Sequence, residues 1–257
     1  MEIRSTKLSA LRQSIAALER PGDAGEGPVT GFGVAEIDAA LPWGGLPHSG
    51  IHEVLGHAED GARFGFTAVL AARVARSMGS GDGTVLWSRS QAVERESGLS
   101  YGPGLSRFGL HPALAMFAVL RSTRDLLQVL EEGLGCGAMA AVVGEGAVLD
   151  ATAARRLQLA AEQGRTPALL LPPAGANSSA LATTRWRIAA LPNGPGEKRG
   201  GEGRDLSSSA RWHVSLLRCR GGAPQEWDVE WEDATLSLHM AATLADGSLA
   251  APSRRAG

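Results

Sequence analysis

The stretch TGFGVAEIDAALPWGGLPHSGIHEVLGHAEDGARFG, residues Thr30–Gly65, decides the fold class. It contains one short apolar segment, Ile51–Leu55, with the composition of a buried strand, and a Gly-rich turn follows. The next apolar segment, Phe66–Arg76 (FTAVLAARVAR), has the length and composition of a helix. A strand, a glycine-rich turn and a helix in this order indicate an α/β protein.

The rest of the chain continues this alternation as far as about residue 184. Strands are expected at Thr84–Trp87, Met116–Leu120, Ala138–Val143 and Ala168–Leu171, and helices at Thr123–Leu134 and Thr152–Glu162. Continuously apolar strands between helices predict a parallel sheet that is covered on both faces. Beyond residue 184, four short or alternating segments predict an antiparallel extension: Trp186–Leu191, Arg211–Leu217, Glu226–Trp231 and Thr235–His239.

The opening stretch also carries a family resemblance. Its pattern, TG followed by ID, AL, GGLP, a glycine, IHEV and a glycine, is similar to the opening of the core in RecA-family recombinases. In that family this segment leads into the phosphate-binding loop G-x-x-x-x-G-K-[ST]. Gly56 and Gly61 keep the spacing of the loop, but Ala62 and Arg63 occupy the positions of the lysine and the hydroxyl residue. The resemblance implies a RecA-like core of the P-loop NTPase type with a degenerate loop.

These replacements decide what chemistry the loop retains. Its backbone N–H groups and the helix that follows still favour an anion. The lysine that contacts the β- and γ-phosphates and the hydroxyl that holds Mg²⁺ are both missing, and Glu59 and Asp60 would repel a triphosphate. We therefore expect no enzymatic activity, no cofactor and a structural turn. Residual ATP or Mg²⁺ binding at Gly56, Gly61 and Arg63 is the first alternative, and ATP hydrolysis is the second.

Three more positions depart from the recombinase pattern. Ser88–Gln91 stands where a glutamate follows the second strand, and Glu94 and Glu96 are expected on a solvated surface instead. Gly144–Glu145 replaces the aspartate on the magnesium side, so that only Glu145 could substitute for it. Pro172–Pro173 replaces a polar residue that senses the nucleotide.

Across roughly residues 1–240 the chain resembles the ImuA family, which is RecA/SulA-like and is encoded beside translesion-synthesis genes in bacteria. The segments that carry the resemblance are residues 41–56, 84–90, 101–110, 130–145, 154–164, 183–192 and 211–232. The resemblance implies a non-catalytic accessory role in SOS-induced mutagenic translesion DNA synthesis and DNA repair. The implied partners are an ImuB-like inactive Y-family polymerase, an error-prone replicative-type polymerase subunit and RecA. The alternatives are a DNA-dependent ATPase with a degenerate loop and a SulA-like inhibitor of cell division.

The first twenty residues predict an amphipathic helix. One stripe is apolar, with Ile3, Leu8, Leu11, Ile15 and Leu18, and Pro21 ends the pattern. The segment also carries three cations that could contact a partner or DNA: Arg4, Lys7 and Arg12. The helix packs either on its own core or on a neighbouring protein.

The last quarter of the chain is rich in tryptophan and arginine. It contains four tryptophans, Trp186, Trp212, Trp227 and Trp231, and five arginines, Arg185, Arg187, Arg211, Arg218 and Arg220. Arginine and tryptophan alternate at 185–187 and at 211–212. Alternation puts the two residue types on opposite faces of a strand, with tryptophan facing the core. The arginines then either face water or contact DNA phosphate or an acidic partner. The loops at 144–150 and 172–184 carry no cation, so we expect any DNA contact to be indirect.

Overall composition limits the class of protein. A chain of 257 residues with a net charge of −2 and 44% hydrophobic residues is typical of a soluble domain without a strongly basic surface. Two cysteines make no disulfide framework, and no apolar run approaches a membrane span, so we expect a cytoplasmic protein. The expected organisation is a helix at 1–20, a linker at 21–29, the core at 30–192, a flexible Gly-rich loop at 193–210, antiparallel strands at 211–244 and a disordered tail at 245–257.

Overall fold

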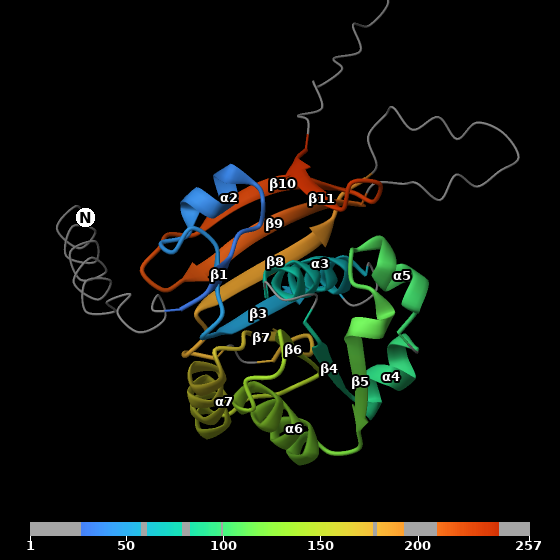
Figure 1. Ribbon diagram of the computed structural model, residues 1–257, viewed down its shortest axis with the longest axis vertical. Coiled ribbons are helices and arrows are strands. Elements are labelled where there is room, and N and C mark those ends of the chain that lie inside the picture. Colours follow the sequence, from blue (N-terminus) through green and yellow to red (C-terminus); the bar gives the residue numbers. More distant parts are fainter. Residues whose placement is uncertain are drawn as a thin grey trace, which may run out of the picture.

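The computed structural model describes residues 27–57, 61–78, 83–98, 100–176, 179–192 and 210–241. They form an α/β structure around a large, mostly parallel sheet (Figure 1). The expected N-terminal helix at 1–20, most of the linker and of the Gly-rich loop, and the tail at 245–257 lie outside the described residues.

The main sheet has nine strands in the order β11-β10-β9-β8-β3-β7-β6-β4-β5. Their bounds are β3 Ile51–Gly56, β4 Val85–Ser90, β5 Ala115–Leu120, β6 Ala141–Glu145, β7 Ala168–Leu171, β8 Thr184–Ala190, β9 Ala210–Cys219, β10 Gln225–Glu232 and β11 Ser237–Met240. The six strands β8, β3, β7, β6, β4 and β5 are parallel to one another. Strands β9, β10 and β11 continue the sheet in antiparallel pairing. A separate antiparallel pair joins β1 (Val29–Thr30) to β2 (Leu46–Pro47).

The helices connect these strands. They are α2 Ala35–Ala40, α3 Ala62–Ser77, α4 Gln91–Ser97, α5 Gly102–Arg107, α6 Thr123–Gly135 and α7 Ala151–Gly164, with a 3₁₀ turn at Pro112–Leu114. Three helices have side-chain N-caps. Ser90, Ser122 and Asp150 accept a hydrogen bond from a backbone N–H in the first turn of α4, α6 and α7, respectively. Such caps satisfy N–H groups that have no partner within the helix.

The order of the predicted strands and helices is confirmed, with one correction. We expected Trp186–Leu191 to begin the antiparallel extension, but β8 pairs parallel with β3 and antiparallel with β9. It is therefore the last parallel strand. The structure adds the short elements α2, α4 and α5, whose few residues show too little apolar periodicity to be predicted.

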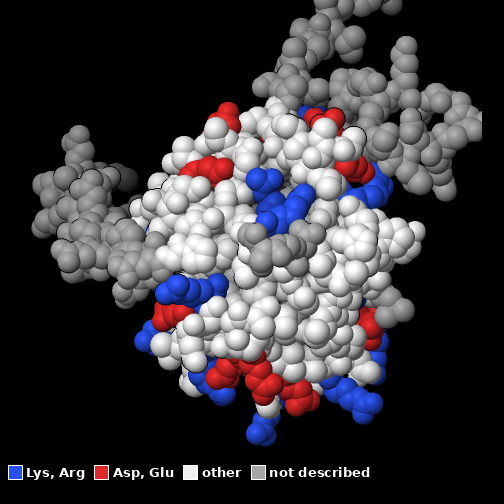
Figure 2. Space-filling model, in the orientation of Figure 1, with Lys and Arg blue, Asp and Glu red and all other residues white. Residues whose placement is uncertain are grey.

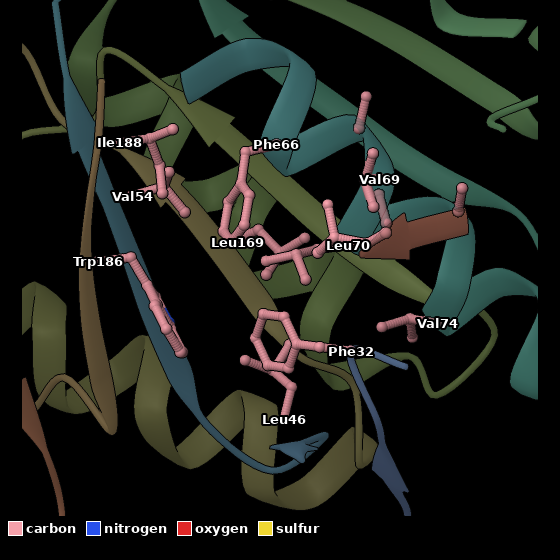
Figure 3. Packing of buried hydrophobic residues seen from close by; sticks show 14 of the residues in the cluster. Phe32, Leu46, Val54, Phe66, Val69, Leu70, Val74, Leu169, Trp186 and Ile188 are labelled. Carbon is pink, nitrogen blue, oxygen red and sulfur yellow. The ribbon is translucent and has the colours of Figure 1, made fainter. Parts of the chain in front are cut away.

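Two apolar layers cover the two faces of the sheet. On one face, α6 and α7 pack over the parallel strands through residues such as Leu126, Leu130 and Leu157. On the other face lies α3, in which Phe66 and Leu70 pack close to Leu169 and Trp186 of the sheet (Figure 3). None of the described helices is long and apolar enough to cross a membrane.

The C-terminal tryptophans face this second layer, as predicted. All four are buried, and Trp186 packs its ring against that of Phe32, with 5.0 Å between centroids. Arg187 is exposed, as expected for the opposite face. Arg211 departs from that expectation because it is buried, with only 8% of its surface exposed. Its Nη1 group donates to the carbonyl of Pro192.

Candidate functional site at the carboxyl end of the parallel strands

The loop that resembles a phosphate-binding loop connects β3 to α3, and Gly56 and Gly61 are described at its two ends. A Cβ atom on Gly56 would lie 2.5 Å from the carbonyl oxygen of Ile188, so only glycine fits there. Gly61 is the N-cap of α3 and has φ 66°, in the left-handed region that favours glycine. Both glycines thus have backbone reasons to be present. Residues 58–60, including Glu59 and Asp60, lie outside the described residues.

Arg63 lies in the first turn of α3 and is half-buried. Its Nη1 group donates a hydrogen bond of 3.0 Å to the carbonyl oxygen of Pro172, immediately after β7. The guanidinium group therefore links α3 to the proline pair, Pro172–Pro173, that follows β7. Ala62, at the position of the lysine, is buried with 3% of its surface exposed and has no charge to offer a phosphate.

Glu145 ends β6 and forms a buried ion pair with Arg89 of β4. Arg89 donates to the same carboxylate oxygen, Oε2, from Nε at 2.8 Å and from Nη2 at 2.5 Å. The side chains of Arg89 and Glu145 are only 5% and 6% exposed. Arg89 also donates from Nη1 to the carbonyl of Gly98 at 2.8 Å. The carboxylate that could have held magnesium is thus neutralised by a neighbouring strand.

Strand register explains why these two groups meet. Arg89 and Glu145 are register partners on adjacent parallel strands. Each follows by two residues a side chain, Trp87 or Val143, that faces α3, so both project to the same face. Glu94 and Glu96 lie on α4, half-buried and exposed respectively. Among the described residues, neither carboxylate makes an ion pair or a hydrogen bond.

A second buried pair joins the centre of the sheet to β8. Glu53, 4% exposed, accepts from Arg185 Nε at 2.7 Å and from the backbone N–H of Ser179 at 2.9 Å. Arg185 also donates to the carbonyl of Ser179. One predicted contact residue for DNA or a partner is therefore used to hold the 179–185 segment against β3.

The other arginines of the C-terminal strands lie beside acidic side chains or backbone carbonyls. Arg211 lies 3.7 Å from Glu230 of β10, and Arg220 donates to the carbonyl of Leu181. Alternation along β10 places four carboxylates on the face opposite its tryptophans: Glu226, Asp228, Glu230 and Glu232. Arg218, on β9, is half-buried and Arg187 is exposed. The predicted arginine residues therefore share their sheet face with a row of negative charge.

The surface charges of the described residues are mixed. On the face drawn in Figure 2, most acidic and basic side chains lie around the rim of a broad uncharged area, and one small group of basic side chains lies in the upper middle of the face. Among the described residues visible there, no continuous basic surface spans the face. Such an arrangement differs from the basic stripe that non-specific binding to nucleic acid requires. Arg4, Lys7 and Arg12 lie outside the described residues.

Glu145 and the segment Ser88–Gln91 were both singled out from the sequence, but the ion pair between Glu145 and Arg89 was not predicted. The sequence does contain a signal for this pair: Arg89 and Glu145 have opposite charges and each follows an apolar strand. Parallel strands end at a common edge, where two such side chains can meet. The order of the strands was needed to show that β4 and β6 are neighbours. The pair between Glu53 and Arg185, 132 residues apart, left no local signal.

No family model matches the sequence. The chain is 34% identical over 238 residues to protein ImuA of Caulobacter vibrioides, both in strain NA1000 / CB15N and in strain CB 15. The alignment covers 87% of this chain and 93% of each relative. Identity at this level over nearly the whole length of both proteins establishes the relationship: the chain belongs to the ImuA family.

Proposed function

We propose that this protein is a non-catalytic accessory factor of SOS-induced mutagenic translesion DNA synthesis. In this proposal its core is RecA-like and serves as a scaffold that binds an ImuB-type polymerase homologue. Membership of the ImuA family supports the pathway. The connection from β3 through a two-glycine loop to α3 supports the RecA-like core.

The observation that carries the proposal is the buried pair between Arg89 and Glu145. Phosphoryl transfer needs cations that contact the phosphates and a carboxylate that can hold magnesium. At the carboxyl end of these strands the carboxylate already has a guanidinium partner, and Arg63 donates to the carbonyl of Pro172. The polar groups are satisfied by one another, which favours a structural role.

Strand β5 supports partner binding. It is the last strand of the sheet and pairs, among the described strands, with β4 alone. Met116, Phe117 and Val119 are exposed on it, at 52%, 40% and 41%. The strand contains no charge, proline or glycine. Proteins usually protect a sheet edge with such residues, so an unprotected apolar edge marks a place where another chain adds on.

The test measures the affinity of the purified protein for the ImuB-type polymerase homologue. Phe117→Lys should weaken the complex at least about tenfold, because a buried aromatic anchor typically contributes more than 1 kcal/mol. The matched control is Met240→Lys on β11, the opposite edge strand, where Met240 is 39% exposed. Ala62→Lys should leave the affinity unchanged. Loss of the complex with Ala62→Lys, or equal loss with both edge variants, contradicts the proposal.

The rival function is a DNA-dependent ATPase with an unusual loop. The feature that favours it is the N-terminus of α3, where the N-cap residue Gly61 has no side chain to occupy the position of an anion. Hydrolysis that single-stranded DNA stimulates and that Gly61→Val abolishes would establish it. A SulA-like role in cell division has no residue in its favour, and binding to the bacterial tubulin homologue would test it.

A further inference from the structure

A groove of about 590 Å³ runs between α6 and α7 on the outer surface of the molecule. Its lining includes Leu127 and Gln128 of α6 and Leu157 of α7. Half-buried Leu127 provides apolar surface above the buried Leu157, and Arg156 of α7 forms an ion pair with Glu131 of α6. The groove therefore has an apolar floor and a charged rim, the character of a site that accepts an amphipathic helix.

The rim has an excess of acidic side chains near one end of α6. Glu131 is paired with Arg156, whereas the next residue, Glu132, is exposed. Among the described residues, the Glu132 carboxylate accepts a hydrogen bond of 2.9 Å from the side-chain amide of Gln128, which carries no charge. A cation approaching along the groove would find this carboxylate available.

The described chain begins close to α7. A Cβ atom on Gly27 would lie 3.4 Å from Ser49 Oγ. The carbonyl of Ser49 accepts a hydrogen bond of 3.4 Å from Gln158, in the middle of α7. Six residues, 21–26, separate Gly27 from the predicted helix and span up to about 20 Å when extended. That length exceeds the diameter of about 10 Å of the helix that must be crossed.

We infer that residues 1–20 of the same chain bind as an amphipathic helix in the groove between α6 and α7. The apolar stripe from Leu8 to Leu18 spans about 15 Å at 1.5 Å per residue, and the 13 residues of α6 span about 20 Å. The segment contributes four cations and two carboxylates, Glu2 and Glu19, so that its net charge is opposite to that of the Glu131, Glu132 and Arg156 group near the carboxyl end of α6. Arg124 lines the other end of the groove. This inference does not rest on the proposed function.

The linker also sets the direction of the helix. Gly27 lies beside Ser49, and the next residue, Gly50, accepts a backbone hydrogen bond from Ala168, four residues after α7 ends. That end of α7 approaches the carboxyl end of α6, because Gly137 and Gly164 are in contact there. The carboxyl end of the 1–20 helix must enter from that side. Cys136, exposed at the C-cap of α6, marks this end of the groove. Ala17 should therefore lie closer to Cys136 than Ala10 does, by two helical turns, or about 10 Å.

Thiol cross-linking in the full-length protein tests both the site and the direction. Ala17→Cys should link to Cys136 through a short bis-maleimide about tenfold faster than Ala10→Cys does, because proximity raises the effective concentration of the second thiol. Cys219 does not interfere: it is buried, and burial raises the pKa of its thiol to about 11.

Controls separate the alternatives. Leu11→Asp with Ile15→Asp puts two carboxylates on the apolar floor and should slow the Ala17→Cys reaction to the Ala10→Cys rate, whereas Ser9→Asp with Gln13→Asp should not. Equal rates for the two cysteines overturn the inference. So does linkage between a tagged and an untagged chain, which would show that the groove takes the segment of a second copy. A rate that the Leu11 and Ile15 changes leave untouched also overturns it.

Discussion

Replacing Arg89 by methionine should destabilise the protein severely, because it leaves the Glu145 carboxylate buried without a cation. The side chain of Glu145 is 6% exposed, and among the described residues Arg89 donates both hydrogen bonds that this carboxylate accepts. Removing one partner of a buried ion pair costs about 3–5 kcal/mol. Glu145→Met should cost a similar amount by leaving the Arg89 guanidinium, 5% exposed, without its counter-ion.

The double variant should recover most of this loss. With both charges gone, the remaining defect is the carbonyl of Gly98, which loses the Arg89 donor at a cost of about 1 kcal/mol. The two changes should therefore be strongly non-additive, with a coupling energy of at least about 5 kcal/mol. Urea unfolding followed by tryptophan fluorescence measures the free energy of unfolding of the wild type, the two single variants and the double variant. Single variants that each cost under about 1 kcal/mol, and that add in the double variant, would refute a buried, mutually satisfied pair.

Two other predictions follow from the buried groups. Burial lowers the pKa of His52 from 6.5 to about 4, since the fully enclosed ring donates and accepts only within the protein. The unfolded chain then binds the proton more readily, so His52 contributes stability that is complete above pH 6.5 and is lost as the pH falls towards 4, by about 3 kcal/mol. His52→Asn should make the free energy of unfolding, measured with urea, depend less on pH between about 6.5 and 4. An unchanged pH dependence would show that His52 is not its cause. Arg63→Ala removes a half-buried charged hydrogen bond to Pro172 and should cost about 1 kcal/mol. It should leave affinity for the polymerase homologue unaltered in the same binding assay, and a weaker complex would place Arg63 at the interface.

Most of the fold could be predicted because its strands are locally apolar. Segments such as ALLL at 168–171 are buried on both faces and need no partner to be recognised. Alternation in Trp186–Ile188 likewise indicated which side faces the core, and Trp186 is fully buried. The parallel partner of β8 could not be inferred, because an alternating strand at the junction of a parallel and an antiparallel region looks the same in either pairing.

The sequence predicted which phosphate-binding residues are missing from the candidate site. It did not predict the contacts that the residues in their place make. The absence of lysine and hydroxyl at Ala62 and Arg63 is a local fact of the sequence. The contact from Arg63 to Pro172 spans 109 residues, and the pair of Arg89 with Glu145 spans 56. Arg211 was expected to face water because it alternates with Trp212. It is buried because the neighbouring strand β10 brings Glu230 beside it and Pro192 covers it.

We propose that the carboxyl end of the parallel strands does not bind or hydrolyse ATP with magnesium. Isothermal titration calorimetry of the full-length protein with ATP, with and without Mg²⁺, measures this binding. We expect no magnesium-dependent heat, because Glu145 is held by Arg89 and Ala62 offers no cation. Saturable, magnesium-dependent ATP binding that Gly61→Val abolishes would contradict it.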